Sequence, residues 1–142
     1  MNTRIRGGNA IDGQFLAAAC SLAPKTFRQA DIPAVRHFAS LFGARAGMGA
    51  PRLADFMLAV SEAAACATSH GPCTARLRLW TTGFRTMCEV RGDGALLRRE
   101  PDPARRGDAE ALRRWLLHQL CDNVSVDDGP QGVTVRFSMT VT

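Results

Sequence analysis

Residues Asp55–Gly71 read D-F-M-L-A-V-S-E-A-A-A-C-A-T-S-H-G, and this stretch decides the fold. Apolar side chains recur within it and just before it at steps of three and four residues, which is the spacing of one face of an α-helix. We therefore expect a helix over 53–70. Its core-facing residues are expected to be Leu53, Phe56, Met57, Val60, Ala64 and Ala67.

The opposite face of this helix carries three chemically capable side chains. Glu62, Cys66 and His70 follow one another at i, i+4 and i+8, so they form a single row. One interpretation is structural, with Glu62 and His70 as solvated surface groups and Cys66 as a small buried hydrophobe. The other is that the row belongs to a functional site.

The spacing of Ser61-Glu62 and His70-Gly71 supports the functional interpretation. This stretch resembles the N-box, S-E-x-x-x-N-x-x-x-H-G, of Bergerat-fold ATP-binding domains in the anti-sigma-factor serine kinases, which share the superfamily of the histidine kinases. In that family the Glu positions or deprotonates a water or a substrate hydroxyl, and the Asn gives magnesium an oxygen ligand. Cys66 stands at the Asn position and offers sulfur, a soft ligand poorly suited to magnesium.

Two further family motifs are altered in this sequence. The motif V-x-D-x-G, whose Asp accepts a hydrogen bond from the adenine amino group, corresponds to Val90–Gly94, where either Gly92 takes the place of the Asp or Asp93 is shifted by one position. The phosphate-binding motif G-x-G-L precedes a helix that ends in Q-L-C-D. Trp115–Asp122 matches that helix, but the glycine positions fall on Ala111 and Arg113.

The closing G-T-T motif of the family corresponds to Gly132-Val133-Thr134, so that Thr134 keeps one hydroxyl. The resemblance implies ATP and magnesium as cofactors, and we expect their binding to be weak or absent because three of the four motifs are altered. It implies no residues of the protein that form a separate metal site. The implied site residues are Glu62 as the catalytic residue and Cys66, His70, Asp93, Gly94, Arg113 and Thr134 as cofactor-binding residues.

The remaining sequence predicts an α+β two-layer sandwich, with about three helices on one face of a mixed, mainly antiparallel sheet of about five strands. The resemblance implies the same arrangement. Residues 1–13 are expected to form a flexible leader and 14–142 a single domain. Periodicity and turn residues predict strands at 15–22, 74–81, 86–91, 124–126 and 133–141, and helices at 31–42, 53–70 and 108–120, with a glycine-rich loop at 43–49.

The helix expected at 108–120 has an apolar face and a polar face. Asp108 is expected to cap its N-terminus. On helical spacing, the apolar face is expected to pack on the core and the polar face to lie mostly away from it. The apolar face consists of Leu112, Trp115, Leu116 and Leu120, and the polar residues are Glu110, Arg113, Arg114 and His118.

Hydropathy, cysteine distribution and net charge limit where the protein is expected to act and what it is expected to bind. No stretch of the 142 residues approaches eighteen consecutive apolar residues, and the polar N-terminus has no apolar region of a signal peptide, which predicts a cytoplasmic protein. The five cysteines are dispersed through apolar segments, so free thiols are expected. The net charge of +5 favours acidic partners.

Two other kinds of site were considered. Cys66, His70 and Cys73 are spaced as zinc ligands can be, but no paired C-x-x-C or second cluster accompanies them. The chain is rich in Arg, but it has no Tyr and few aromatic residues that could stack on bases, so we expect no direct binding of nucleic acid. An ordinary solvated surface accounts for most of the arginines that suggest it, which are Arg76, Arg78, Arg98, Arg99, Arg105, Arg106, Arg113 and Arg114.

The resemblance, together with the altered motifs, implies a bacterial regulatory protein of the anti-sigma type with a degraded ATP site. It would act by binding a sigma factor or an anti-anti-sigma partner of the STAS type, with no membrane involved. The alternative is an active ATP-dependent serine/threonine kinase that phosphorylates such a partner. The resemblance also implies a homodimer.

Overall fold

The computed structural model describes residues 25–69, 74–93, 103–130 and 132–142. Apart from the first strand and a short 3-10 helix, which the sequence did not predict, its helices and strands follow the expected order. They are β1 (Lys25–Phe27), η1 (Gln29–Asp31), α2 (Ile32–Ala46), α3 (Ala50–Ala67), β2 (Ala75–Thr82), β3 (Arg85–Gly92), α4 (Pro103–Leu120), β4 (Asn123–Gly129) and β5 (Gly132–Thr140).

The five described strands form one sheet in the order β1-β2-β3-β5-β4. All four pairings between them are antiparallel, so the parallel component that a mixed sheet would contain is absent from the described strands. The hairpin β2-β3 pairs Ala75 with Gly92 at one end and Thr82 with Arg85 at the other. Strand β5 lies between β3 and β4, so it is paired along both of its edges.

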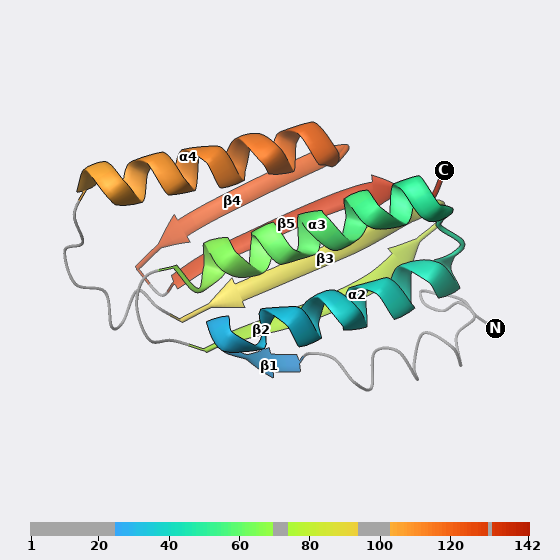
Figure 1. The fold of residues 1–142 in the computed structure, drawn as a ribbon, viewed down its shortest axis with the longest axis horizontal. Helices are drawn as coiled ribbons and strands as arrows, with labels where there is room; N and C mark the ends of the chain where they lie inside the picture. Colours follow the sequence, from blue (N-terminus) through green and yellow to red (C-terminus); the bar gives the residue numbers. More distant parts are fainter. Residues whose placement is uncertain (1–24, 70–73, 94–102, 131) are drawn as a thin grey trace.

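The three helices cover one face of this sheet (Figure 1). Helix α3 lies over β3 and β5, α2 over β2, and α4 beside α3 over β4. The buried apolar residues of β2, β3 and β5 alternate along each strand and point toward the helices. Phe56 of α3 meets Phe137 of β5 edge to face at the centre of this core, with ring centroids 6.1 Å apart. The expected two-layer α+β sandwich is confirmed.

Helix α3 begins and ends close to the expected residues. Gly49 is its N-cap, Pro51 lies in its first turn, and the Thr68 hydroxyl donates a hydrogen bond to the Ala64 carbonyl at its C-terminus. Its length of 18 residues gives the buried apolar stripe that the periodicity predicted. Cys66 is only 1% exposed, as in the structural interpretation of this residue.

The prediction of a loop over 43–49 is wrong in its first half. Helix α2 continues through Gly43 to Ala46, and only then does Gly47 adopt a left-handed conformation. Gly43 lies where α2 crosses α3, and a Cβ there would stand 2.6 Å from the Leu53 side chain. The glycine that suggested a turn therefore serves close packing between two helices.

The prediction for the third helix is wrong in two respects. Helix α4 begins at Pro103, so Asp108 lies inside it and is not its cap. The helix is also rotated relative to the expectation, because Leu112 and Trp115 are 58% and 57% exposed while Leu117 is fully buried. Arg113 instead faces α3, where it pairs with Glu62.

The strand expected at 15–22 lies outside the described residues, as does the leader over 1–13. The first described strand is β1, which consists of three residues and pairs with β2. No described helix is long and apolar enough to cross a membrane.

Candidate functional site

The expected site residues fall into three separate groups in the structure. Glu62 and Cys66 on α3 lie next to Arg113 on α4. Asp93 lies just after the end of β3. Thr134 lies on the face of the sheet that points away from the helices. His70 and Gly94 lie outside the described residues.

The first group is a polar contact between α3 and α4. Glu62 and Arg113 form an ion pair with 3.9 Å between the carboxylate Oε1 and the guanidinium Nε, and their side chains are 22% and 26% exposed. Next to Glu62, the buried Ser61 hydroxyl accepts a hydrogen bond of 3.2 Å from Arg36 on α2. Glu62, which corresponds to the catalytic Glu of the family, is thus paired with Arg113. Arg113 stands at the second glycine position of the family's phosphate-binding motif.

Cys66 is buried one helical turn after Glu62. Burial raises the pKa of its thiol, the Glu110 carboxylate adds to this, and the Arg114 and Arg113 charges act against it. The side chain is therefore a neutral thiol at neutral pH, which is a poor ligand for magnesium. The Nε of Arg114, on the neighbouring helix, is buried without a hydrogen-bond partner among the described residues.

The second group surrounds the C-terminal end of β3. Gly92 packs directly on the last turn of α3, where an added Cβ would stand 2.1 Å from the Ala67 carbonyl oxygen. Gly132 approaches from β5 with φ of 133°, and a Cβ there would stand 1.8 Å from the Gly92 carbonyl oxygen. Three backbones therefore fill this end of the sheet, and no side chain fits between them.

Asp93 is occupied by contacts within this end of the sheet. Its Oδ1 accepts a hydrogen bond from the backbone N–H of Thr74, and its Oδ2 accepts one from the Thr74 hydroxyl, each at 3.0 Å. The Asp93 backbone N–H in turn donates to the Thr74 carbonyl. Both carboxylate oxygens thus close the open end of the β2-β3 hairpin.

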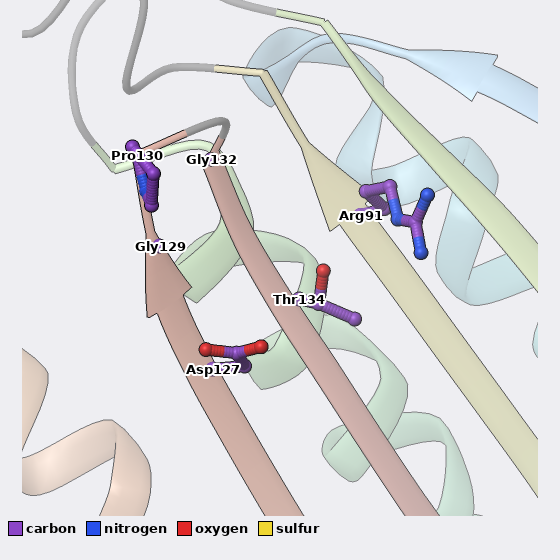
Figure 2. Close-up of a pocket in the computed structure, with 6 residues that line it drawn as sticks. All are labelled: Arg91, Asp127, Gly129, Pro130, Gly132 and Thr134. Atoms are coloured by element: carbon purple, nitrogen blue, oxygen red, sulfur yellow. The ribbon is translucent and has the colours of Figure 1, made fainter.

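Thr134 belongs to the third group, on the face of the sheet away from the helices. Register places it between Arg91 on β3 and Asp127 on β4. Figure 2 shows these three side chains on neighbouring strands, with α3 passing behind the sheet and the Arg91 side chain extending away from Asp127. They line a hollow of about 300 Å³ together with Gly129, Pro130 and Gly132.

Comparison with protein-family models agrees with this architecture. The model for the histidine kinase-like ATPase domain matches residues 26–139, which span the five described strands and three helices. The chain belongs to this family. A search of curated proteins finds none that matches it. The match concerns the family as a whole and does not distinguish the anti-sigma group within it.

The described residues do not fit magnesium-bound ATP as the family motifs would hold it. Gly92 leaves no room for the adenine-binding Asp, and Asp93 has both carboxylate oxygens engaged by Thr74. Cys66 is a buried neutral thiol in place of the metal-binding Asn. In the described part of the chain, no cluster of three or more His, Cys, Asp or Glu side chains could hold a metal ion.

Sequence reasoning missed the most polar surface of the sheet. The face away from the helices presents four arginines around Glu89, which line a second hollow of about 490 Å³. Alternation along the strands could have revealed this surface, since Arg76 and Arg78 on β2, Glu89 and Arg91 on β3, and Arg136 on β5 all point to the side opposite the buried apolar residues. Its members are Arg76, Arg78, Glu89, Arg91 and Arg136.

Proposed function

We propose that this member of the histidine kinase-like ATPase family is a regulatory binding protein of the anti-sigma type whose nucleotide site has degraded. It acts by holding a protein partner, and it does not depend on ATP to do so. The partner is a sigma factor or a partner-switching protein of the STAS type.

The close contact between Gly92 and Ala67 is the main observation that supports a loss of nucleotide binding. In the family motif, the position that Gly92 occupies supplies the carboxylate that accepts the adenine amino hydrogen. With the Ala67 carbonyl oxygen 2.1 Å from a hypothetical Cβ at position 92, a side chain that carries a carboxylate has no space there. A buried adenine amino group without its partner costs about 1 to 3 kcal/mol.

The ion pair between Glu62 and Arg113 supports the loss of kinase activity. A general base needs a free carboxylate within hydrogen-bond reach of the proton that it removes. Here the carboxylate is paired with a guanidinium on α4, and the helix that contributes this guanidinium starts at Pro103, well before the register of the family's second glycine. The space beside Glu62 is thus taken by a helix that carries an Arg in place of a glycine.

The protein-binding half of the proposal rests on the resemblance of the 61–71 stretch to anti-sigma kinases, together with the retained scaffold. In that group, gripping the sigma factor and phosphorylating the antagonist are separable activities. A domain that keeps its core and loses its nucleotide contacts retains the first activity. The exposed side chains of Leu112 and Trp115 on α4 are consistent with a chain that contacts another protein.

Affinity capture from the native cell tests this proposal. The full chain serves as bait with and without ATP and magnesium, and retained proteins are identified by mass spectrometry. We expect a sigma factor or a STAS-type protein to be retained equally under both conditions and to remain unphosphorylated. Transfer of phosphate to a retained STAS-type protein, lost in Glu62→Gln, would establish the active kinase in its place.

A further inference from the structure

The open face of the sheet is built from rungs of side chains that cross the strands. In one rung, Arg76 on β2 is opposite Arg91 on β3, and Arg91 is opposite Thr134 on β5. In the next rung, Arg78 on β2 is opposite Glu89 on β3, which is opposite Arg136 on β5. The four guanidinium groups therefore come from three adjacent strands and point to the same side.

Glu89 organises the second rung. Its carboxylate accepts a hydrogen bond of 2.7 Å from the Nε of Arg136 and lies 3.5 Å from Arg78. Burial raises the pKa of Glu89, but the hydrogen bond and charge of Arg136 and the charges of Arg78 and Arg91 outweigh it and lower the pKa. Arg78 and Arg136 nonetheless keep 58% of their side chains exposed, so they are oriented by Glu89 and still open to solvent.

The first rung has no carboxylate between its two arginines. Its one acidic residue is Asp127 on β4, which is opposite Thr134, and the Arg91 side chain extends away from it (Figure 2). Arg76 and Arg91 are exposed and directly opposite, and neither forms an ion pair with another described residue. Like charges directly opposite on neighbouring strands destabilise a sheet. Across the hollow, four guanidinium groups face one carboxylate, which leaves a charge of 4 − 1 = +3. An unfavourable arrangement of this kind is relieved by a bound anion.

We propose that this face, defined by Arg76, Arg78, Arg91 and Arg136, is a docking surface for an acidic segment of a partner protein. The surface lies on the side of the sheet away from Glu62 and Cys66. The proposal therefore goes beyond the loss of the nucleotide site and does not depend on it.

The geometry of the surface favours carboxylates on an extended segment. Successive rungs are about 7 Å apart along the strands, which is the spacing of every second residue in an extended peptide. Glu side chains at that spacing reach both rungs and pair with exposed guanidinium groups, each of which can bind a carboxylate through two parallel hydrogen bonds. The Thr134 hydroxyl, next to Arg91 in the first rung, offers one further donor.

The same geometry disfavours nucleic acid. Single strands are held on sheet surfaces by aromatic rings on which bases stack. In the described part of this face the one aromatic ring is that of Trp80, and the Arg78 guanidinium lies over it at 5.2 Å from the ring centroid. One side of the ring is thereby covered, so the surface offers charge without a stacking platform.

Fluorescence anisotropy with a labelled synthetic peptide tests this inference. The probe is a peptide of about twelve residues in which Glu alternates with Thr, measured at low ionic strength where surface charge is least screened. The test variant is the full chain with Arg76→Gln and Arg91→Gln. The control is Arg28→Gln with Arg45→Gln, which removes the same charge from two exposed positions, one just before η1 and one in the last turn of α2. Thermal unfolding confirms that both variants fold.

We expect the wild-type protein to bind the peptide, the test variant to lose about tenfold or more in affinity, and the control to change by less than about twofold. Three results would overturn the proposal. They are no binding of the peptide by the wild-type protein, an equal loss in the control variant, or tighter binding of an oligothymidine of similar length that also depends on Arg76 and Arg91.

Discussion

Gly92 and Ala67 touch through their backbones, with the Ala67 carbonyl oxygen only 2.1 Å from the place where a side chain at position 92 would begin. Replacing Gly92 by Asp, the residue of the family motif, should therefore destabilise the protein. We expect a loss of about 3 kcal/mol or more in the free energy of unfolding, because α3 must move away from β3. Urea unfolding followed by circular dichroism measures this.

Gly129→Ala is the matched control, since no heavy atom lies within 4 Å of a Cβ at that position and its φ is not positive. It should change the free energy of unfolding by less than about 0.5 kcal/mol. If Gly92→Asp folds with wild-type stability and gains ATP binding, α3 does not pack on β3 as described.

The orientation of α4 gives the second prediction. Leu117 is fully buried and Trp115 is 57% exposed. Leu117→Ala should cost about 2 to 5 kcal/mol, whereas Trp115→Ala should cost less than about 1 kcal/mol because its ring is largely in solvent already. Chemical unfolding of the two variants measures both. The reverse ranking would restore the apolar face expected from the sequence.

Helices α3 and α4 differ in how well their buried faces could be predicted from the sequence. In α3 the apolar stripe is broad and faces the sheet, so periodicity predicted the helix and four of its buried residues, which are Phe56, Val60, Ala64 and Ala67. The helix spans 50–67 in place of 53–70, and Leu53 and Met57 are only partly buried.

In α4, Leu112, Trp115 and Leu116 form an equally clear apolar stripe. The surface of α3 that faces α4, however, carries the polar residue Glu62. Pairing of Arg113 with Glu62 accompanies a rotation that leaves Leu112 and Trp115 outward. That outcome depends on a contact between distant residues, which no local pattern contains.

The candidate site was predictable to a similar extent. The positions of Glu62, Cys66 and Arg113 followed from motif spacing, and the structure brings these three together. The role of Asp93 could not be predicted from the motif, because its partner Thr74 is 19 residues away in sequence. The register of the β2-β3 hairpin brings the two residues together. The arginine surface was passed over because each Arg taken singly is an ordinary solvated residue. Only strand pairing shows that Arg76 and Arg91 are opposite each other.

The carboxylate of Glu89 gives a prediction on pH. Its pKa is lowered in the folded protein, so its pairing stabilises the fold above the unfolded-state pKa of about 4.3 and is lost as the pH falls through the lower folded value. Arg136→Gln removes the hydrogen bond, and we expect a loss of about 1 kcal/mol at pH 7, discounted for the exposure of Arg136.

Urea unfolding of the wild-type protein and Arg136→Gln across this acidic range should show the difference between them shrinking as the pH falls. Arg85→Gln is the control, because Arg85 lies on the same face at the far end of β3 from Glu89. A difference for Arg136→Gln that is independent of pH would mean that Glu89 is not its partner.

The buried thiols give a prediction on reactivity. Cys66, Cys88 and Cys121 are free, as expected, while Cys20 and Cys73 lie outside the described residues. Burial raises the pKa of all three described thiols, that of Cys121 to about 12. In the native protein they should react with a thiol reagent at least about a hundredfold more slowly than free cysteine, and at the normal rate in urea.

Alkylation followed by peptide mapping assigns these rates to single cysteines. Raising the pH from about 7 to about 9 increases the thiolate fraction of an ordinary thiol, whose pKa is near 8.5, only about 25-fold, because that fraction levels off above the pKa. The three described thiols have raised pKa values, so their rates should stay below that of free cysteine at both pH values and should still be rising steeply at pH 9. Rapid native labelling of Cys66 at pH 7 would show a thiolate beside Arg113 and Arg114, contrary to the burial described.

The most direct test of the proposed loss of nucleotide binding is titration calorimetry of the full chain with ATP and magnesium. Loss of the metal ligand at Cys66, of the adenine contact at Gly92 and of the phosphate-binding glycine at Arg113 would each cost about 1 to 2 kcal/mol, or roughly 3 to 6 kcal/mol together if they act independently. A site that began with micromolar affinity would then bind ATP with a Kd of about a millimolar or weaker. We predict that result. A Kd below about ten micromolar, abolished by Glu62→Ala or Asp93→Ala, would contradict the account and place ATP in the family site.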